Sequence, residues 1–417
     1  MKISLKINMK MIAFLLLMSI LGIVAIIVNV KPLYLFVLCC WLYLMFYAYS
    51  DIDNRGMLFA FLIAFFVFLL GRDFLQEFFK YKVENFDQKT QNHAWISSSI
   101  SLLTIIMVYP LCSKRYKKKI SKRKKENKIY TLIAQKISRV VYYFSWIFAV
   151  TSKIVVGMFV SARGFTDYYT DYSEYLSGNS YLYIISKMEL IMPVAWCIYL
   201  ATLPSKKQIK IPLILYILYL IVSLGSGQRL FVFVYFIYRN GMNSEEKWLT
   251  KKMIVGIILI LPFLAVFVSA YNIWREGGNA SSLNFFEGIL NFFYDQGVTG
   301  NVLKRAYMYK NQIPKQIYTL EFLHSGILAR LFNIKVYHGN TVDHAMYGGS
   351  FTHTLGYTVM NSAYLAGRGT GSSYIAELYQ DFGYTGIILG NILYSFLLAR
   401  ITKNEDNDSL LKKSIKF

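Results

Sequence analysis

The residues in this chain that are best suited to chemistry lie in its last third. The segment GRGTGSSYIAELYQDFGYTG, residues 367–386, holds one arginine and two carboxylates and is followed directly by the apolar segment 387–399. Charged side chains beside a membrane span are costly, and those that occur there usually act on a substrate or an ion. We therefore predict that Arg368, Glu377 and Asp381 belong to the functional site.

Three further arginines lie at the ends of apolar segments. They are Arg163 in SARGFTDYY, Arg229 in GSGQR and Arg275 in YNIWREGG. A guanidinium stays charged at physiological pH and binds phosphate oxygens through two parallel hydrogen bonds. A single arginine at a membrane edge is as often an anchor whose head reaches the lipid headgroups. The prediction of a diphosphate site therefore depends on several arginines sharing one face.

Two other groups of charges have competing interpretations. Glu377 and Asp381 are four residues apart and share a face if the segment is helical, but acids at that place also complement the dipole of the following helix. Lys153 and Glu189 are predicted at similar depth on antiparallel helices, where a structural ion pair is more frequent than a relay. A transporter would instead use them, with Lys187, to line a path.

The elements that must hold these residues are membrane helices. Of the 417 residues, 55% are hydrophobic and only 16% are charged, and a transmembrane helix needs about 20 predominantly apolar residues. Hydropathy windows of that length predict ten spans, at 11–30, 32–50, 57–71, 96–112, 140–160, 182–203, 211–225, 230–238, 253–271 and 387–399. The predicted fold class is an all-helical polytopic membrane protein.

The chain is predicted to form a single membrane domain, residues 1–417. The run SKRYKKKISKRKKENK follows the fourth span and places the basic loop 113–139 in the cytoplasm by the positive-inside rule. With ten spans, both termini are then cytoplasmic, and the loops 161–181 and 272–384 are external. The larger external loop is predicted to carry the active site.

The sequence does not support a nucleic-acid partner, a metal ion or another cofactor. The net charge of +22 is explained by positive-inside loops and by attraction to anionic lipid, so we predict contact with membrane lipid and no nucleic-acid partner. The four cysteines lie in or at the edges of predicted spans, and the five histidines have no metal-ligand spacing. We predict no metal and no other cofactor.

The tail 367–386 before an apolar span, the SGQR break and the arginine after the ninth span together resemble the bacterial oligosaccharide repeat-unit polymerases, the Wzy proteins of O-antigen and capsule assembly. The resemblance implies a metal-independent glycosyltransferase of the GT-C type in the cytoplasmic (inner) membrane. It would join repeat units carried on undecaprenyl diphosphate at the external face.

The resemblance also implies roles for single residues. The implied site residues are Glu377, His353 and Arg368 for catalysis, and Arg229, Arg275, Arg163, Tyr374 and Asp381 for binding of the diphosphate or glycan. The arginines would hold diphosphate oxygens, and either Glu377 or His353 would orient or deprotonate the acceptor hydroxyl.

The implied partners are the undecaprenyl-diphosphate-linked glycan, a chain-length regulator and a flippase. Two other functions stay open. An O-antigen ligase has a similar topology and also uses external arginines and a histidine, but it would transfer the glycan to lipid A–core. A polysaccharide or lipid transporter or flippase would show inverted repeats or paired broken helices, and we find neither in the sequence.

Overall fold

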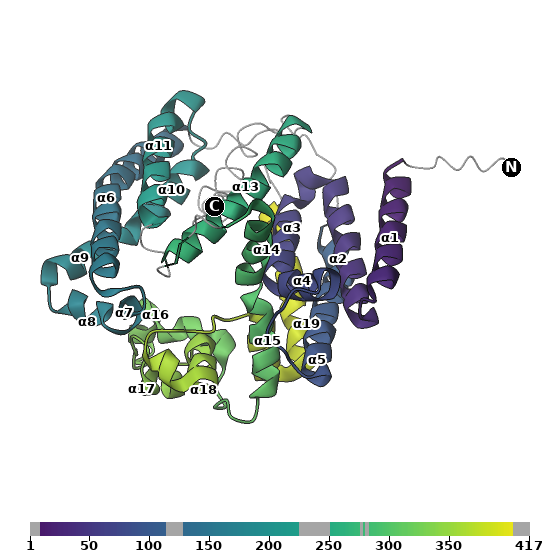
Figure 1. The fold of residues 1–417 in the computed structure, drawn as a ribbon. Coiled ribbons are helices and arrows are strands. Elements are labelled where there is room, and N and C mark those ends of the chain that lie inside the picture. Colours follow the sequence, from purple (N-terminus) through teal and green to yellow (C-terminus); the bar gives the residue numbers. More distant parts are fainter. Residues whose placement is uncertain (1–8, 114–127, 225–250, 276–277, 280–282, 403–417) are drawn as a thin grey trace.

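The computed structural model describes residues 9–113, 128–224, 251–275, 278–279 and 283–402. Within these ranges every regular element is a helix (Figure 1). Six helical stretches there are long and apolar enough to cross a membrane: Pro32–Ser50, Asn54–Phe79, Gln88–Cys112, Tyr130–Arg163, Ser180–Ala201 and Tyr374–Ile401. The prediction of an all-helical, multi-pass membrane protein is confirmed. The count of ten spans and the GT-C type stay predictions, and the predicted span 230–238 lies outside the described residues.

A first bundle combines the amino-terminal helices with the last helix. Its elements are α1 (Met9–Val28), α2 (Pro32–Ser50), α3 (Ile52–Phe65), the π-helical turn η1 (Phe66–Leu70), α4 (Gly71–Phe79), α5 (Gln88–Cys112) and α19 (Tyr374–Thr402). α5 packs on both α2 and α19, and Trp95 of α5 is buried against Tyr34 of α2. Ser101 of α5 donates a 2.7 Å hydrogen bond to Asn391 of α19. Small residues and such polar contacts are what hold helices together within lipid.

A second bundle lies on the other side of the molecule (Figure 1). It consists of α6 (Lys128–Arg163), α9 (Ser180–Glu189), α10 (Ile191–Ala201) and α11 (Lys206–Leu224), with α6 contacting the other three. The Nζ of Lys153 on α6 lies 2.5 Å from Oε1 of Glu189 on α9, and Ser152 Oγ donates to Oε2 of the same carboxylate at 2.6 Å. The predicted pairing of Lys153 with Glu189 is confirmed.

A buried ion pair joins the first bundle to the helices α13 (Lys251–Arg275), α14 (Phe285–Gln296) and α15 (Val298–Met308). Lys304 of α15 lies 2.5 Å from Oδ1 of Asp73 on α4, and Trp95 Nε1 of α5 donates to Oδ2 of Asp73 at 2.8 Å. Lys304 and Asp73 are both buried. Buried charges require such partners, so this contact fixes α15 against α4 and α5.

Short helices cover one end of the molecule, at the bottom of Figure 1. They are α7 (Asp167–Thr170), α8 (Tyr172–Ser177), the 3₁₀ helix η3 (Tyr318–His324), α16 (Gly326–Leu331), α17 (Val342–Tyr347) and α18 (Phe351–Leu365). They come from the predicted loops 161–181 and 272–384. The two segments meet where the backbone N–H of Asn340 donates to Tyr169 O at 3.0 Å.

Candidate functional site

α19 consists of two arms separated by a break at Gly383. The φ of Gly383 is 63° and its ψ is −153°, a conformation that glycine adopts without the steric penalty met by other residues. We call residues 374–382 the first arm and residues 384–402 the second arm. The second arm contains the predicted last span, 387–399, and at 1.5 Å per residue it is about 28 Å long, close to the thickness of the hydrocarbon layer.

The first arm folds back against the second arm. Tyr374, at the start of the first arm, has its ring centroid 4.7 Å from that of Tyr394. Leu378, one turn later, lies against Gly390, where any side chain larger than hydrogen would collide with it. Leu378 is nearer to the break than Tyr374 on the first arm, and its partner Gly390 is nearer to the break than Tyr394 on the second arm. This is the pairing of an antiparallel hairpin.

The hairpin makes the preceding loop re-entrant. The hydroxyl of Tyr374 is 2.8 Å from Ser101 Oγ on α5, whereas Tyr384, next to the break, has its hydroxyl 2.9 Å from Nδ1 of His93 on the same helix. Ser101 and His93 are eight residues apart, so the start of the first arm lies about 12 Å deeper along α5 than the break. Residues 366–373 therefore enter the bundle and the first arm returns. Non-helical backbone at such depth occurs only where protein or a water-filled cavity surrounds it.

Contacts with neighbouring segments hold the backbone of the re-entrant loop in place, and the side chain of its arginine is exposed. We call residues 366–373 the Arg368 loop. Gly367 has a φ of 88°, and its Cα lies so close to the backbone of Thr166 that a side chain would collide. The carbonyl of Arg368 accepts a 2.9 Å hydrogen bond from Asn340 Nδ2, while the Arg368 side chain is exposed. A fixed backbone with an exposed guanidinium suits the binding of an anion.

Glu377 lies on the first arm, directly after this loop. Its side chain is half-buried, and its Oε1 accepts a hydrogen bond from Ser372 Oγ within the Arg368 loop. Among the described residues, no donor contacts its Oε2. The structure thus joins two of the three predicted catalytic residues, Arg368 and Glu377, through one short loop.

The side chains of Asp381 and Tyr374 form hydrogen bonds with other groups of the protein. The carboxylate of Asp381 accepts hydrogen bonds from the backbone N–H groups of Tyr318 at 3.0 Å and Thr319 at 2.8 Å, and from Thr319 Oγ1 at 2.8 Å. It thereby caps the start of η3. The Tyr374 hydroxyl bonds to Ser101 of α5 and donates to Asn391 Oδ1 of the second arm at 3.1 Å. Their predicted contacts with substrate stay predictions, and the observed contacts give both residues a part in holding the hairpin.

We expect Asp381→Ala to destabilise the protein more than it harms the chemistry. The change removes three hydrogen bonds to a carboxylate, each worth about 1.5–3 kcal/mol, and leaves the backbone N–H groups of Tyr318 and Thr319 without that acceptor. Thermal unfolding of the purified protein in detergent should show a lower midpoint, with activity per folded molecule near that of the wild type. An unchanged midpoint combined with lost activity would instead support a contact of Asp381 with substrate.

Two histidines stack beside the Arg368 loop. The ring centroids of His344 and His353 lie 3.6 Å apart with a 23° angle between planes. His344 Nδ1 donates to Gly339 O at 2.8 Å, which fixes the proton on that nitrogen because a carbonyl only accepts, and His353 Nδ1 lies 2.9 Å from the Tyr364 hydroxyl. Burial lowers the pKa of His353 to about 4 and lowers the pKa of His344 as well. Both rings are therefore neutral at physiological pH.

Asn340 connects the histidine pair to the Arg368 loop. Its Nδ2 donates to Tyr364 O at 2.7 Å as well as to Arg368 O, and the Tyr364 hydroxyl bonds to His353. All three predicted catalytic residues are thus connected to the Arg368 loop. Asn340 and Tyr364 were not predicted from the sequence, since a lone asparagine and a lone tyrosine in a long loop follow no recognisable pattern.

The other predicted arginines are distributed as follows. Arg163 ends α6 with an exposed side chain, its guanidinium 5.3 Å from the centre of the Phe159 ring. Because Thr166 contacts Gly367, Arg163 lies at the same end of the molecule as Arg368. Arg275 is the last residue of α13. Arg229 lies outside the described residues.

Within the described ranges, no three His, Cys, Asp or Glu side chains lie close enough to hold a metal ion together. The charged groups at the site include the exposed guanidinium of Arg368 and the carboxylates of Glu377 and Asp381. The site can therefore bind an anion and accept a proton through its own side chains, and metal independence stays a prediction.

Comparison with known proteins gives one match. No curated protein and no solved structure matches the chain. The family model described as O-antigen polysaccharide polymerase Wzy matches residues 9–417, nearly the whole chain. The match includes α5, α18 and α19, which form the site, and agrees with the multi-pass helical fold. This chain belongs to the O-antigen polysaccharide polymerase Wzy family.

Proposed function

We propose that the protein joins oligosaccharide repeat units, each linked to undecaprenyl diphosphate, at the external face of the cytoplasmic membrane. Membership of the polymerase family supplies the reaction class. The observation that carries the substrate assignment is the re-entrant Arg368 loop, which places an exposed guanidinium directly before a half-buried carboxylate. A polyprenyl diphosphate has its charges at the membrane surface and its chain in the hydrocarbon, so a re-entrant loop can approach it from within the bundle.

The proposed reaction transfers the growing glycan to the new repeat unit. The hydroxyl oxygen of the acceptor sugar attacks the anomeric carbon of the donor glycan, and the bond from that carbon to the diphosphate oxygen breaks. Glu377 takes the hydroxyl proton, which makes the oxygen a better nucleophile. The diphosphate leaves with the bonding electron pair. Arg368 stabilises the negative charge that develops on it, an effect that is strong where water is excluded.

The other predicted residues have supporting parts in this proposal. Arg163 lies at the same end of the molecule as Arg368, and together with Arg275 and Arg229 it would complete the diphosphate site. His353 is neutral and hydrogen-bonded to Tyr364, so it is suited to orienting a sugar hydroxyl. Burial lowers the pKa of His353 to about 4, which removes the advantage that an ordinary imidazole has over a carboxylate as a base near neutral pH. We assign the base to Glu377 because it lies directly after the Arg368 loop.

The external orientation rests on the charge pattern of the chain. The basic run of residues 113–128 joins α5 to α6, whereas the start of α5 and the end of α6 lie at the opposite end, with the Arg368 loop and the short helices (Figure 1). The positive-inside rule assigns the basic run to the cytoplasm. The proposed site then faces outward, where the lipid-linked repeat units would arrive.

Deletion of the gene in its host tests the proposed function. Surface glycan resolved by size on a gel should change from a ladder to core bearing a single repeat unit, because one unit can still be transferred without polymerisation. Core bearing no repeat unit would indicate a ligase or a flippase instead. An unaltered ladder would remove the protein from this pathway.

A further inference from the structure

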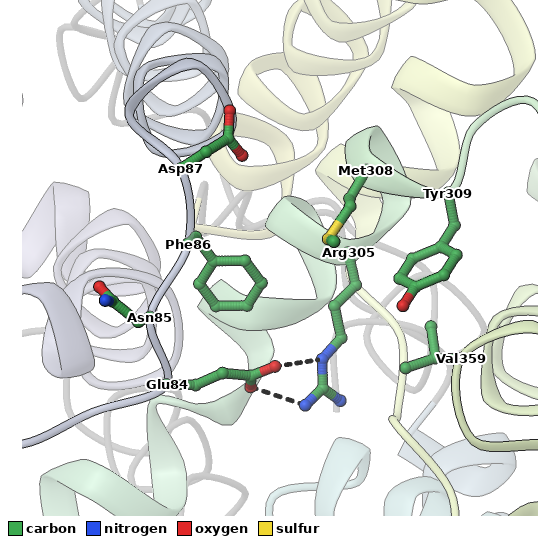
Figure 2. Close-up of a pocket in the computed structure, with 8 residues that line it drawn as sticks. All are labelled: Glu84, Asn85, Phe86, Asp87, Arg305, Met308, Tyr309 and Val359. Atoms are coloured by element: carbon green, nitrogen blue, oxygen red, sulfur yellow. Dashed lines mark hydrogen bonds and ion pairs between the residues drawn. The ribbon is translucent and has the colours of Figure 1, made fainter.

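A cavity of about 200 Å³ lies beside the proposed site and has no part in the reaction described above. Its walls come from three places: the segment before α5, which contributes Glu84, Phe86 and Asp87; α15 and the residue that follows it, which contribute Arg305 and Tyr309; and Val359 of α18 (Figure 2). These elements lie far apart in the sequence, so only the fold forms the cavity. Glu84 and Asp87 are exposed, so ligands can reach it from solvent.

Two aromatic rings form opposite walls. Figure 2 shows Phe86 on one side of the cavity and Tyr309 on the other, with Arg305 between them. Phe86 is partly buried, and Lys304 Nζ lies 5.2 Å from its ring centre on the α15 side. Tyr309 is partly buried as well. Aromatic faces of this kind pack against the C–H faces of a pyranose ring, and a tyrosine adds a hydroxyl that can hydrogen-bond.

The polar groups of the cavity are held rigidly. Arg305 donates from Nε to Oε1 of Glu84 at 3.3 Å and from Nη2 to Oε2 at 2.6 Å, and Asn301 Nδ2 also donates to Oε2 at 2.9 Å. The remaining terminal nitrogen of Arg305 lies on the side of Val359 (Figure 2). Hydrogen bonds from Thr90 lower the pKa of Asp87, so its carboxylate is an acceptor at physiological pH. That carboxylate points toward the first turn of α5 and away from the remaining Arg305 nitrogen (Figure 2). The Arg305 nitrogen is therefore the fixed polar group that can donate to a sugar hydroxyl in the cavity.

We infer that this cavity is a subsite for one neutral pyranose ring of the glycan. The inference rests on the proposed function and extends it to a place for the sugar chain. Pockets for drug-sized ligands measure about 300–1,000 Å³, so a cavity of about 200 Å³ takes one ring and not an oligosaccharide. Val359 is six residues from His353 on α18, which is about 9 Å along the helix. The subsite therefore binds a sugar near the reacting one and aligns the chain.

Direct binding tests the subsite with a probe that lacks lipid and diphosphate. The full chain is placed in lipid nanodiscs and titrated with single-repeat oligosaccharide obtained by partial acid hydrolysis of the host's surface polysaccharide, and binding is followed by saturation-transfer NMR. Phe86→Leu should weaken binding roughly tenfold, equivalent to about 1.4 kcal/mol. Tyr309→Phe should weaken it less, because it removes only the hydroxyl.

The control variants separate this inference from the proposed function. Lys89→Ala changes an exposed charge in the first turn of α5 outside the cavity and should bind the oligosaccharide as the wild type does. Arg368→Ala should also bind it normally, because the probe has no diphosphate. Absence of saturable binding to the wild type, or binding by Phe86→Leu and Tyr309→Phe as tight as that of the wild type, would overturn the subsite and leave the polymerase assignment intact. A normal glycan ladder from Arg368→Ala would count against the proposed function alone.

Discussion

Replacement of Arg368 by alanine should reduce the surface glycan from a ladder to core bearing a single repeat unit. The guanidinium is exposed on a loop whose backbone is fixed by Asn340 and by Thr166, so its removal deletes charge without disturbing packing. Loss of one preorganised group that stabilises transition-state charge lowers rates by about 10²–10³-fold. The measurement is complementation of the deletion strain, with glycan resolved on a gel and protein quantified in membranes.

Two further variants test whether a loss of polymer results from the loss of the Arg368 guanidinium itself. Arg368→Lys keeps the charge but not the paired donors of the guanidinium, so it should restore only short chains. Arg330→Ala removes an exposed arginine of α16 outside the Arg368 loop and should give a normal ladder. A full ladder from Arg368→Ala at wild-type protein level would show that the loop does not bind the diphosphate.

Replacement of Glu377 by glutamine should lower polymerisation by about 10²–10⁴-fold, the usual contribution of a general base. Glutamine has nearly the same shape and its amide oxygen can still accept the hydrogen bond from Ser372, so folding should be preserved. The measurement is the rate at which purified enzyme in detergent joins lipid-linked repeat units, together with the melting temperature of each variant. Glu174→Gln, an exposed acid on α8, is the matched control and should be fully active.

The same assay distinguishes Glu377 from His353 as the base. A group with a lowered pKa loses its neutral form only as the pH falls through that value, which for His353 is about 4. His353 should therefore produce no titration step in the rate between about pH 6 and pH 8, and His353→Asn should lower the rate less than Glu377→Gln. A larger loss from His353→Asn with Glu377→Gln active would exchange the two roles.

The sequence by itself determined the class of the protein and most of its candidate residues. An apolar composition with basic loops can only be accommodated by membrane helices, because backbone groups in lipid must bond within their own segment. The pairing of Lys153 with Glu189 also followed from span positions, since two unlike charges at one depth in a membrane need each other. Arg368 and Glu377 were predicted as site residues because charged side chains beside a membrane span cost free energy, and only a function or an ion pair offsets that cost.

Only the tertiary structure decided how these residues are placed. The sequence predicted Glu377 and Asp381 as neighbours on one helical face before the last span, whereas the break at Gly383 folds that segment back into the bundle. Hydropathy depends on local composition and contains no information about a reversal of the chain direction. That reversal is set by the backbone dihedral angles of Gly383 and by contacts with α5 and the second arm. The same holds for Asn340, Tyr364 and the cavity beside α15. Their groups come together across long stretches of chain, and only packing of the complete fold brings such groups into contact.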